Sequence, residues 1–102
     1  MTLLVKIHKA TRYVVAICDK DIFGQKFLDA DNIRQIDLTT SFFQGEEKSE
    51  EEVEEIMLEM VREDASFNLV GEKTCEIALK TGLVDKESVT RIANIPVALT
   101  LL

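Results

Sequence analysis

The segment that most constrains the fold is an acidic amphipathic helix, which we predict over about residues 50–63. Ser49 and Glu52 form the S-x-x-E capping box that marks a helix start, and glutamates fill the first turn, where the helix dipole favours negative charge. The apolar side chains form a single stripe at helical spacing: Val53, Ile56, Met57, Met60 and Val61. A helix with one apolar stripe buries it against another element, so we expect this helix to lie across a β-sheet.

The strands of that sheet are predicted on both sides of the helix. Two runs of branched apolar residues, 2–9 and 12–18, are joined by a short polar link and predict an N-terminal β-hairpin. Residues 25–28 and 33–38 are expected to form short extended pieces. Residues 95–102 predict a buried C-terminal strand.

A second helix is predicted over about residues 69–81, with its start near Asn68 or Gly71, a cap from Ser66 or Asn68 and a stop at Gly82. With 102 residues, of which 46% are hydrophobic and 30% charged, the chain is expected to form a single domain over residues 1–102. The predicted fold class is α+β. A small antiparallel or mixed sheet starts with the hairpin, is packed by the two helices and includes the C-terminal strand.

The negative charge of the chain belongs to one segment. The formal net charge is −7, and residues 46–64 alone hold ten acids against two cations, a local charge of −8. An acidic chain is repelled by phosphate backbones, so direct nucleic-acid binding is not expected. A protein partner with a basic surface could bind the acidic helix, and the candidate residues are Glu51, Glu54 and Glu55. The alternative is that these carboxylates only keep one face of the helix solvated.

A cysteine–histidine nucleophile is not expected. His8 is the only histidine, and in the predicted hairpin it lies opposite Tyr13, whereas Cys18 lies opposite Leu3. That register separates His8 and Cys18 by roughly 16 Å at ~3.3 Å per residue, while a catalytic pair needs hydrogen-bond contact. Without a C-x-x-C pair, Cys18 and Cys75 are expected to be buried, reduced thiols.

No metal and no cofactor are expected, because the aspartates of residues 19–31 lack the alternating ligands and the closing glutamate of a calcium loop. The run NLVGEK has one glycine and does not make a phosphate-binding loop. A ligand site remains as an alternative, between the turn at 19–27 and the predicted helix start at 68–72. Its candidate residues are Asp19, Lys26, Asn68, Glu72 and Arg91. The competing interpretation is that these residues serve as turns and helix caps.

The compartment predicted from the sequence is the cytoplasm. No apolar run approaches the ~20 residues that a membrane-spanning helix needs. The apolar N-terminal stretch is interrupted by Lys6, Lys9 and Arg12, which is unlike a secretory signal.

Four segments together resemble one protein family: VVAICDKDIFGQKF, the FF-x-G-E run before the acidic helix, NLVGEKTCEIALKTGLV and the late RIANIPVA. Over essentially the whole chain, the sequence is similar to the archaeal family called domain of unknown function 424. The resemblance implies a cytoplasmic archaeal protein of about this length with an α+β fold. It implies no activity, cofactor or catalytic residue, and it suggests an association with translation genes.

Three functional hypotheses follow. The first is a non-enzymatic protein-interaction module, linked to translation or RNA metabolism through a protein contact. The second is a small enzyme or ligand-binding domain that uses the site between the 19–27 turn and the 68–72 helix start. The third is a homo-oligomer joined through an exposed edge of the hairpin or of the last strand. We favour the first hypothesis.

Overall fold

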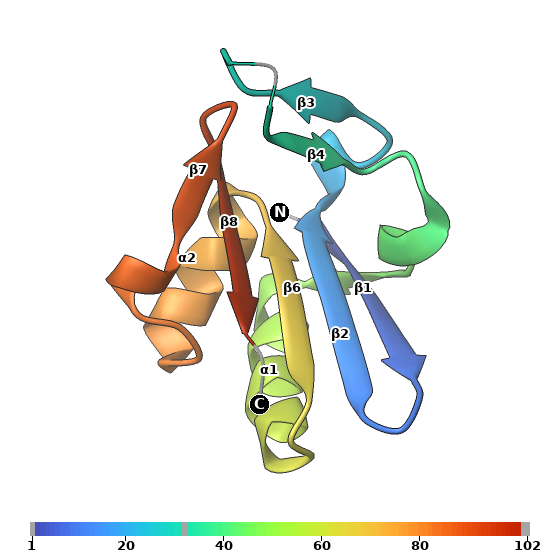
Figure 1. Cartoon of the computed structure of the whole chain (residues 1–102). Coiled ribbons are helices and arrows are strands. Elements are labelled where there is room, and N and C mark those ends of the chain that lie inside the picture. The colour runs from blue at the N-terminus through green and yellow to red at the C-terminus, as the bar shows by residue number, and fades with distance from the viewer. Residues whose placement is uncertain (1, 32, 101–102) are drawn as a thin grey trace.

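The computed structural model, which describes residues 2–31 and 33–100, is organised around a mixed sheet of six strands in the order β5-β1-β2-β6-β8-β7 (Figure 1). Neighbouring strands are antiparallel except β2 and β6, which are parallel. The strands are β1 (Thr2–Lys9), β2 (Tyr13–Asp19), β5 (Glu46–Ser49), β6 (Ser66–Val70), β7 (Thr90–Ile92) and β8 (Ile95–Thr100). The predicted α+β class and the N-terminal hairpin are therefore confirmed.

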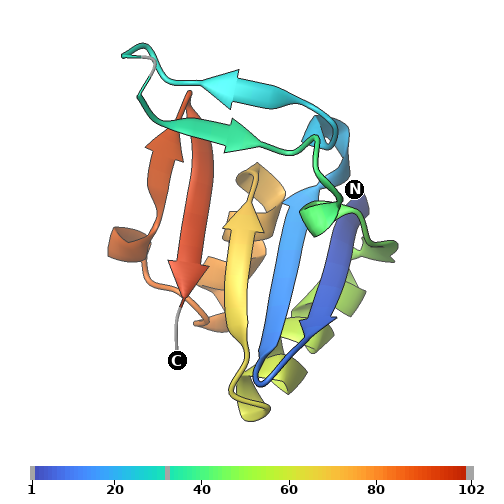
Figure 2. The same cartoon turned by 45° about the vertical axis from the view of Figure 1, so that its right-hand side comes forward.

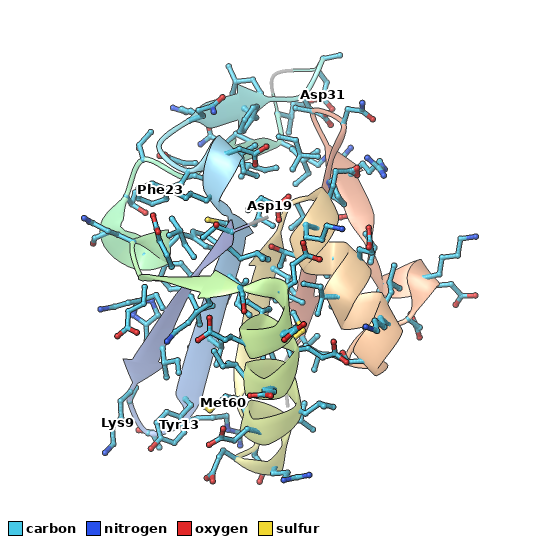
Figure 3. All side chains as sticks on the ribbon, turned by 180° about the vertical axis from the view of Figure 1, so that it is seen from behind. Lys9, Tyr13, Asp19, Phe23, Asp31 and Met60 are labelled. Atoms are coloured by element: carbon cyan, nitrogen blue, oxygen red, sulfur yellow. The ribbon has the colours of Figure 1, made fainter. Side chains whose placement is uncertain are left out.

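Two helices, α1 (Glu50–Arg62) and α2 (Glu72–Thr81), cover one face of the sheet, and both lie in front when the molecule is seen from that side (Figure 3). The main core lies between the helices and the sheet. Its largest fully buried members are Phe67, Leu3, Ile17 and Met57. Neither helix in residues 2–31 and 33–100 is long and apolar enough to cross a bilayer.

A two-stranded hairpin, β3 (Lys26–Leu28) with β4 (Gln35–Asp37), crosses the upper end of the opposite sheet face (Figure 2). A second cluster of buried residues forms beneath it and includes Cys18, Leu38, Phe43 and Val70. Three short 3₁₀ turns complete the described elements: η1 (Lys20–Ile22), η2 (Ser41–Phe43) and η3 (Lys86–Ser88).

The predicted second helix is confirmed as α2, and of the two predicted starts the one near Gly71 is correct, because residues 66–70 form the central strand β6 and α2 begins at Glu72. Neither Ser66 nor Asn68 caps a helix. The sequence SFNLV is buried on both faces of the sheet, where a strand carries no clear polar alternation. Asn68 resembled a helix cap in the sequence, although it lies in the middle of β6, opposite Leu99 of β8.

The predicted register of the hairpin is also wrong by one residue. Cys18 pairs with Leu4 and His8 pairs with Val14, so the loop between the strands is one residue longer than expected. A one-residue slip exchanges the two faces of a strand. As a result Leu3 and Val5 face the helices together with Ile17.

The two edges of the sheet are the short strands β5 and β7, of four and three residues. The expected exposed edges are therefore only partly covered, because β5 pairs with residues 2–5 of β1 and β7 pairs with residues 95–97 of β8. The outer edge of β1 from Lys6 to Lys9 and that of β8 from Ala98 to Thr100 have no partner in these ladders, within the residues that the structure describes. Short edge strands offer little template for pairing with a second chain. β8 confirms the predicted C-terminal strand up to Thr100, and residues 101–102 lie outside the described part of the chain.

Candidate functional site

Helix α1 carries the three carboxylates predicted to bind a partner. Glu51 and Glu55 are exposed, and neither forms an ion pair within the described part of the chain. Glu54 is different, because it accepts a charge-assisted hydrogen bond from Nζ of Lys80 at 3.2 Å, and 35% of its side chain is exposed. Two of the three candidates are thus available to a partner, while the third helps to join α1 to α2.

Other acids in the first turn of α1 serve the fold. The Ser49 side chain accepts from the backbone N–H of Glu52, and the Glu52 carboxylate accepts from the backbone N–H of Ser49 at 2.9 Å, so the predicted capping box is confirmed. The backbone N–H and the hydroxyl of Ser49 lower the pKa of Glu52. Glu50 lies 3.6 Å from Nζ of Lys73 on α2.

A hollow of about 540 Å³ separates the N-terminal half of α1 from α2. Four carboxylates and one ammonium group line it: Glu50, Glu51, Glu54, Glu76 and Lys80. The carboxylates that line this hollow outnumber the cations that pair with them. This end of the groove between the helices is therefore negative.

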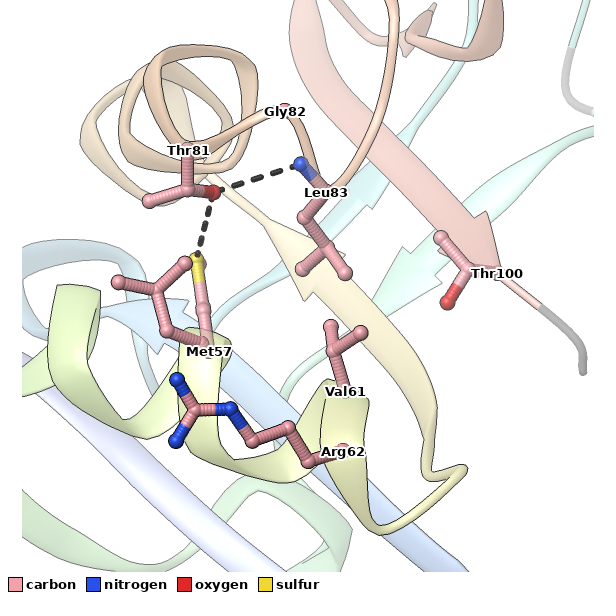
Figure 4. Close-up of a pocket in the computed structure, with 8 residues that line it drawn as sticks. Met57, Val61, Arg62, Thr81, Gly82, Leu83 and Thr100 are labelled. Carbon is pink, nitrogen blue, oxygen red and sulfur yellow. Dashed lines mark hydrogen bonds between the residues drawn. The ribbon is translucent and has the colours of Figure 1, made fainter.

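An apolar hollow of about 330 Å³ lies at the other end of the same pair of helices. Val61 from α1 and Leu83 from the loop after α2 point toward each other across it (Figure 4). Leu58 and Val61 remain 48% and 41% exposed although both line this hollow. No sequence pattern predicted this surface. The signal that could have indicated it is Leu58, a large apolar residue that lies outside the apolar stripe of the helix.

Asp19, a predicted ligand-site residue, is 4% exposed and serves as the cap of α2. Its carboxylate accepts from the backbone N–H groups of Lys73 at 3.0 Å and Thr74 at 2.9 Å, and from the Thr74 hydroxyl at 2.7 Å. In Figure 3 Asp19 lies at the end of its strand, beside the start of α2. A helix N-terminus is a position where anions bind, and here the chain fills it with its own carboxylate.

Gly71 permits this arrangement. Its φ of +121° is a backbone conformation that side chains disfavour, and a Cβ at this position would lie 2.4 Å from Cγ of Asp19. Asp19 and the helix start were predicted to lie close together, but as parts of a ligand site. Asp19 and its partner Lys73 lie 54 residues apart in the chain, so no local sequence pattern indicates their contact.

The other candidates for the ligand site do not form one cluster with Asp19. Glu72 and Arg91 form an exposed ion pair at 2.9 Å next to the start of α2. Lys26 lies exposed on β3, and Asn68 lies within β6 on the sheet face opposite the helices. In the part of the chain that the structure describes, no group of three or more His, Cys, Asp or Glu side chains is placed to hold a metal ion.

The two cysteines are not placed for nucleophilic chemistry. Burial, with a smaller effect of Asp19, raises the pKa of Cys18 and of Cys75 to about 12. His8 stacks on Phe42, and its Nε2 lies 2.9 Å from the Phe42 carbonyl oxygen. Cys18 and His8 are four pairs apart along the ladder between β1 and β2, so they do not form a catalytic pair.

Comparison with known proteins gives a family and a fold. The model of the family described as "Protein of unknown function (DUF424)" matches residues 8–101. The chain is also similar to the crystal structure of an uncharacterized conserved protein from Methanopyrus kandleri, with a TM-score of 0.82, 19% identity, and coverage of 98% of this chain and 90% of that one. No curated protein matches the chain. At this identity the crystal structure supports the fold alone.

Proposed function

Since the chain belongs to DUF424, a family of proteins of unknown function, we propose from its surface that it is a non-enzymatic interaction module whose helix α1 binds a protein partner with a basic surface. The main support is the position of Glu51 and Glu55. Both are exposed on the outer face of α1, and neither forms an ion pair within the described residues. Exposed like charges repel one another, and a basic partner relieves that repulsion while gaining complementary contacts.

The charge also selects the class of partner. A surface with this excess of carboxylates repels the phosphates of nucleic acid, so the partner is a protein. Proteins of translation and RNA metabolism carry basic surfaces because they bind phosphate backbones. The proposal therefore includes a partner of that class, in line with the association that the family resemblance suggests.

An affinity pull-down tests the proposal. The wild-type chain and the triple variant Glu51→Ala, Glu54→Ala, Glu55→Ala are used as baits in lysate of the organism that encodes the chain. We expect the wild type to recover a reproducible partner at low salt, and we expect that partner to be lost with the triple variant. It should also be lost from the wild type at about 0.5 M NaCl, because salt screens exposed charges.

The matched control is Glu87→Ala on η3, which removes an exposed carboxylate far from α1 in the sequence. This variant should retain the partner. Recovery of no reproducible partner at low salt would contradict the proposal, and so would a partner that the triple variant retains. Circular dichroism of each bait ensures that the comparison is made between folded proteins.

A further inference from the structure

The surface between α1 and α2 changes from negative to apolar along its length, and we propose that it is a groove for one amphipathic segment of a partner protein. The segment would carry Lys or Arg side chains at one end and large apolar side chains at the other. This inference rests on the proposed function and specifies the chemistry and the orientation of the partner that α1 binds.

The two hollows lie along the same stripe of each helix. On α1 the lining residues Glu51, Glu54, Leu58 and Val61 are three or four positions apart, so they lie on one side of the helix. On α2 the lining residues Ile77 and Thr81 are four positions apart. The acidic hollow and the apolar hollow are therefore successive parts of one groove, with the acidic part at the start of α1.

The apolar end provides a place for large side chains. Leu58 and Val61 are each more than 40% exposed, and Leu83 faces Val61 from the opposite side of the hollow (Figure 4). Apolar side chains that remain open on both sides of a groove lose water-exposed area when a third apolar group enters. Two α-helices that flank a groove present an arrangement into which an amphipathic helix can lay its apolar face.

Charge sets the orientation of the segment. Glu50, Glu51, Glu54 and Glu76 line one end. Lys80 pairs with Glu54, and Lys73 pairs with Glu50 and Glu76, so the four carboxylates outnumber the two ammonium groups beside them. Arg62 lines the apolar end. Cations of the partner are attracted to the start of α1 and repelled from Arg62, so the basic end of the segment lies near Glu51 and its apolar end near Val61.

The length of the groove limits the length of the segment. The 13 residues of α1 span about 20 Å at a rise of ~1.5 Å per residue. A helical segment of about 13 residues therefore follows the groove from end to end.

A peptide selection tests this inference. A library of random peptides of about 16 residues, long enough to follow α1, is displayed on phage and selected on the immobilised full chain. We expect the enriched peptides to combine Lys or Arg at one end with Leu, Ile, Met or Phe at the other. The most enriched peptide is then synthesised with a fluorescent label, and its dissociation constant is measured by anisotropy.

Two pairs of substitutions separate the two ends of the groove. Glu51→Gln with Glu54→Gln removes charge from the acidic end, and Leu58→Ser with Val61→Ser removes exposed apolar groups from the other end. Each pair should weaken peptide binding by about tenfold or more, as expected for residues at the centre of an interface. The controls are Leu79→Ser and Glu87→Gln, which alter exposed side chains that line neither hollow and should leave the dissociation constant unchanged.

Each outcome has a defined meaning. Suppose that Glu51→Gln with Glu54→Gln abolishes peptide binding but Leu58→Ser with Val61→Ser does not. That result would overturn the groove, while the proposal that α1 binds a basic partner would stand. Binding that depends on neither pair, or a selection that enriches no peptide, would overturn the groove. If the protein forms a concentration-dependent dimer, and Glu51→Gln with Glu54→Gln dissociates that dimer, then a second copy of this chain occupies the surface. This result would also overturn the inference.

Discussion

Asp19 sets the start of a helix from a strand that is distant in the sequence. Its carboxylate accepts from two backbone N–H groups and one hydroxyl at the beginning of α2, while the residue at the cap position, Gly71, has no side chain to offer. The long-range contact ties β2 to α2. It also removes the free N–H groups that an external anion would need.

Replacing Asp19 should therefore destabilise the fold. Asp19→Ala leaves three buried or partly buried donors without an acceptor, which should cost roughly 2–4 kcal/mol of unfolding free energy. Asp19→Asn retains one acceptor oxygen and should lose less. Urea unfolding followed by circular dichroism measures both variants, and a wild-type midpoint for Asp19→Ala would show that the cap is dispensable.

The thiols allow a second test at the scale of single residues. Because burial raises the pKa of Cys18 and Cys75 to about 12, almost none of either thiol is ionised at pH ~8, and the thiolate is the reactive form. We expect a disulfide reagent such as dithionitrobenzoate to leave the folded protein unmodified and to modify both cysteines in denaturant. Fast reaction of one thiol in the folded protein would contradict this assignment.

At the scale of elements, α1 shows what local sequence can predict. Its capping box, first-turn acids and apolar stripe are contained within fifteen residues, and the structure confirms a helix from Glu50 to Arg62. The cap of α2 was mispredicted because it comes from β2, beyond any local pattern. β5 and β7 were not predicted for a similar reason. Each is short and lacks apolar alternation, and it is a strand because it pairs with β1 or β8.

The capping box of α1 should contribute measurably to stability. Ser49→Ala removes the acceptor for the backbone N–H of Glu52 and should cost about 1 kcal/mol. Ser41→Ala is the control, since the Ser41 side chain is exposed and makes no hydrogen bond within the described residues. Both are compared by urea unfolding, and equal midpoints for the two variants would argue against the cap.

At the scale of the whole molecule, the strand order could not be read from the sequence. The parallel pair β2–β6 brings residues 14–18 against residues 66–70, across nearly half the chain. A further long-range contact holds the outer hairpin in place, because the Asp29 carboxylate accepts from the backbone N–H of Ala93 at 2.7 Å. The same side chain also pairs locally with Arg34. The long-range contacts depend on tertiary structure, and local residue patterns do not encode them.

The Asp29 contact predicts a pH dependence. The backbone N–H of Ala93, and then Arg34, lower the pKa of Asp29 in the folded state. The stabilisation is therefore present above the unfolded pKa of about 4 and is lost as the pH falls through the lower folded value. We expect the melting temperature of Asp29→Asn to lie below that of the wild type at pH ~7, and the difference to shrink below pH ~4. A difference that stays constant across this range would contradict the prediction.

The central claim is that the acidic face of α1 contacts a basic protein, and zero-length cross-linking of the captured complex tests it most directly. A carbodiimide joins a carboxylate to an amine only when the two are in contact, and mass spectrometry then identifies the joined residues. The proposal predicts cross-links from Glu51 and Glu55 to lysines of the partner. Cross-links confined to carboxylates elsewhere, such as Asp31 or Glu87, with none on α1, would contradict it.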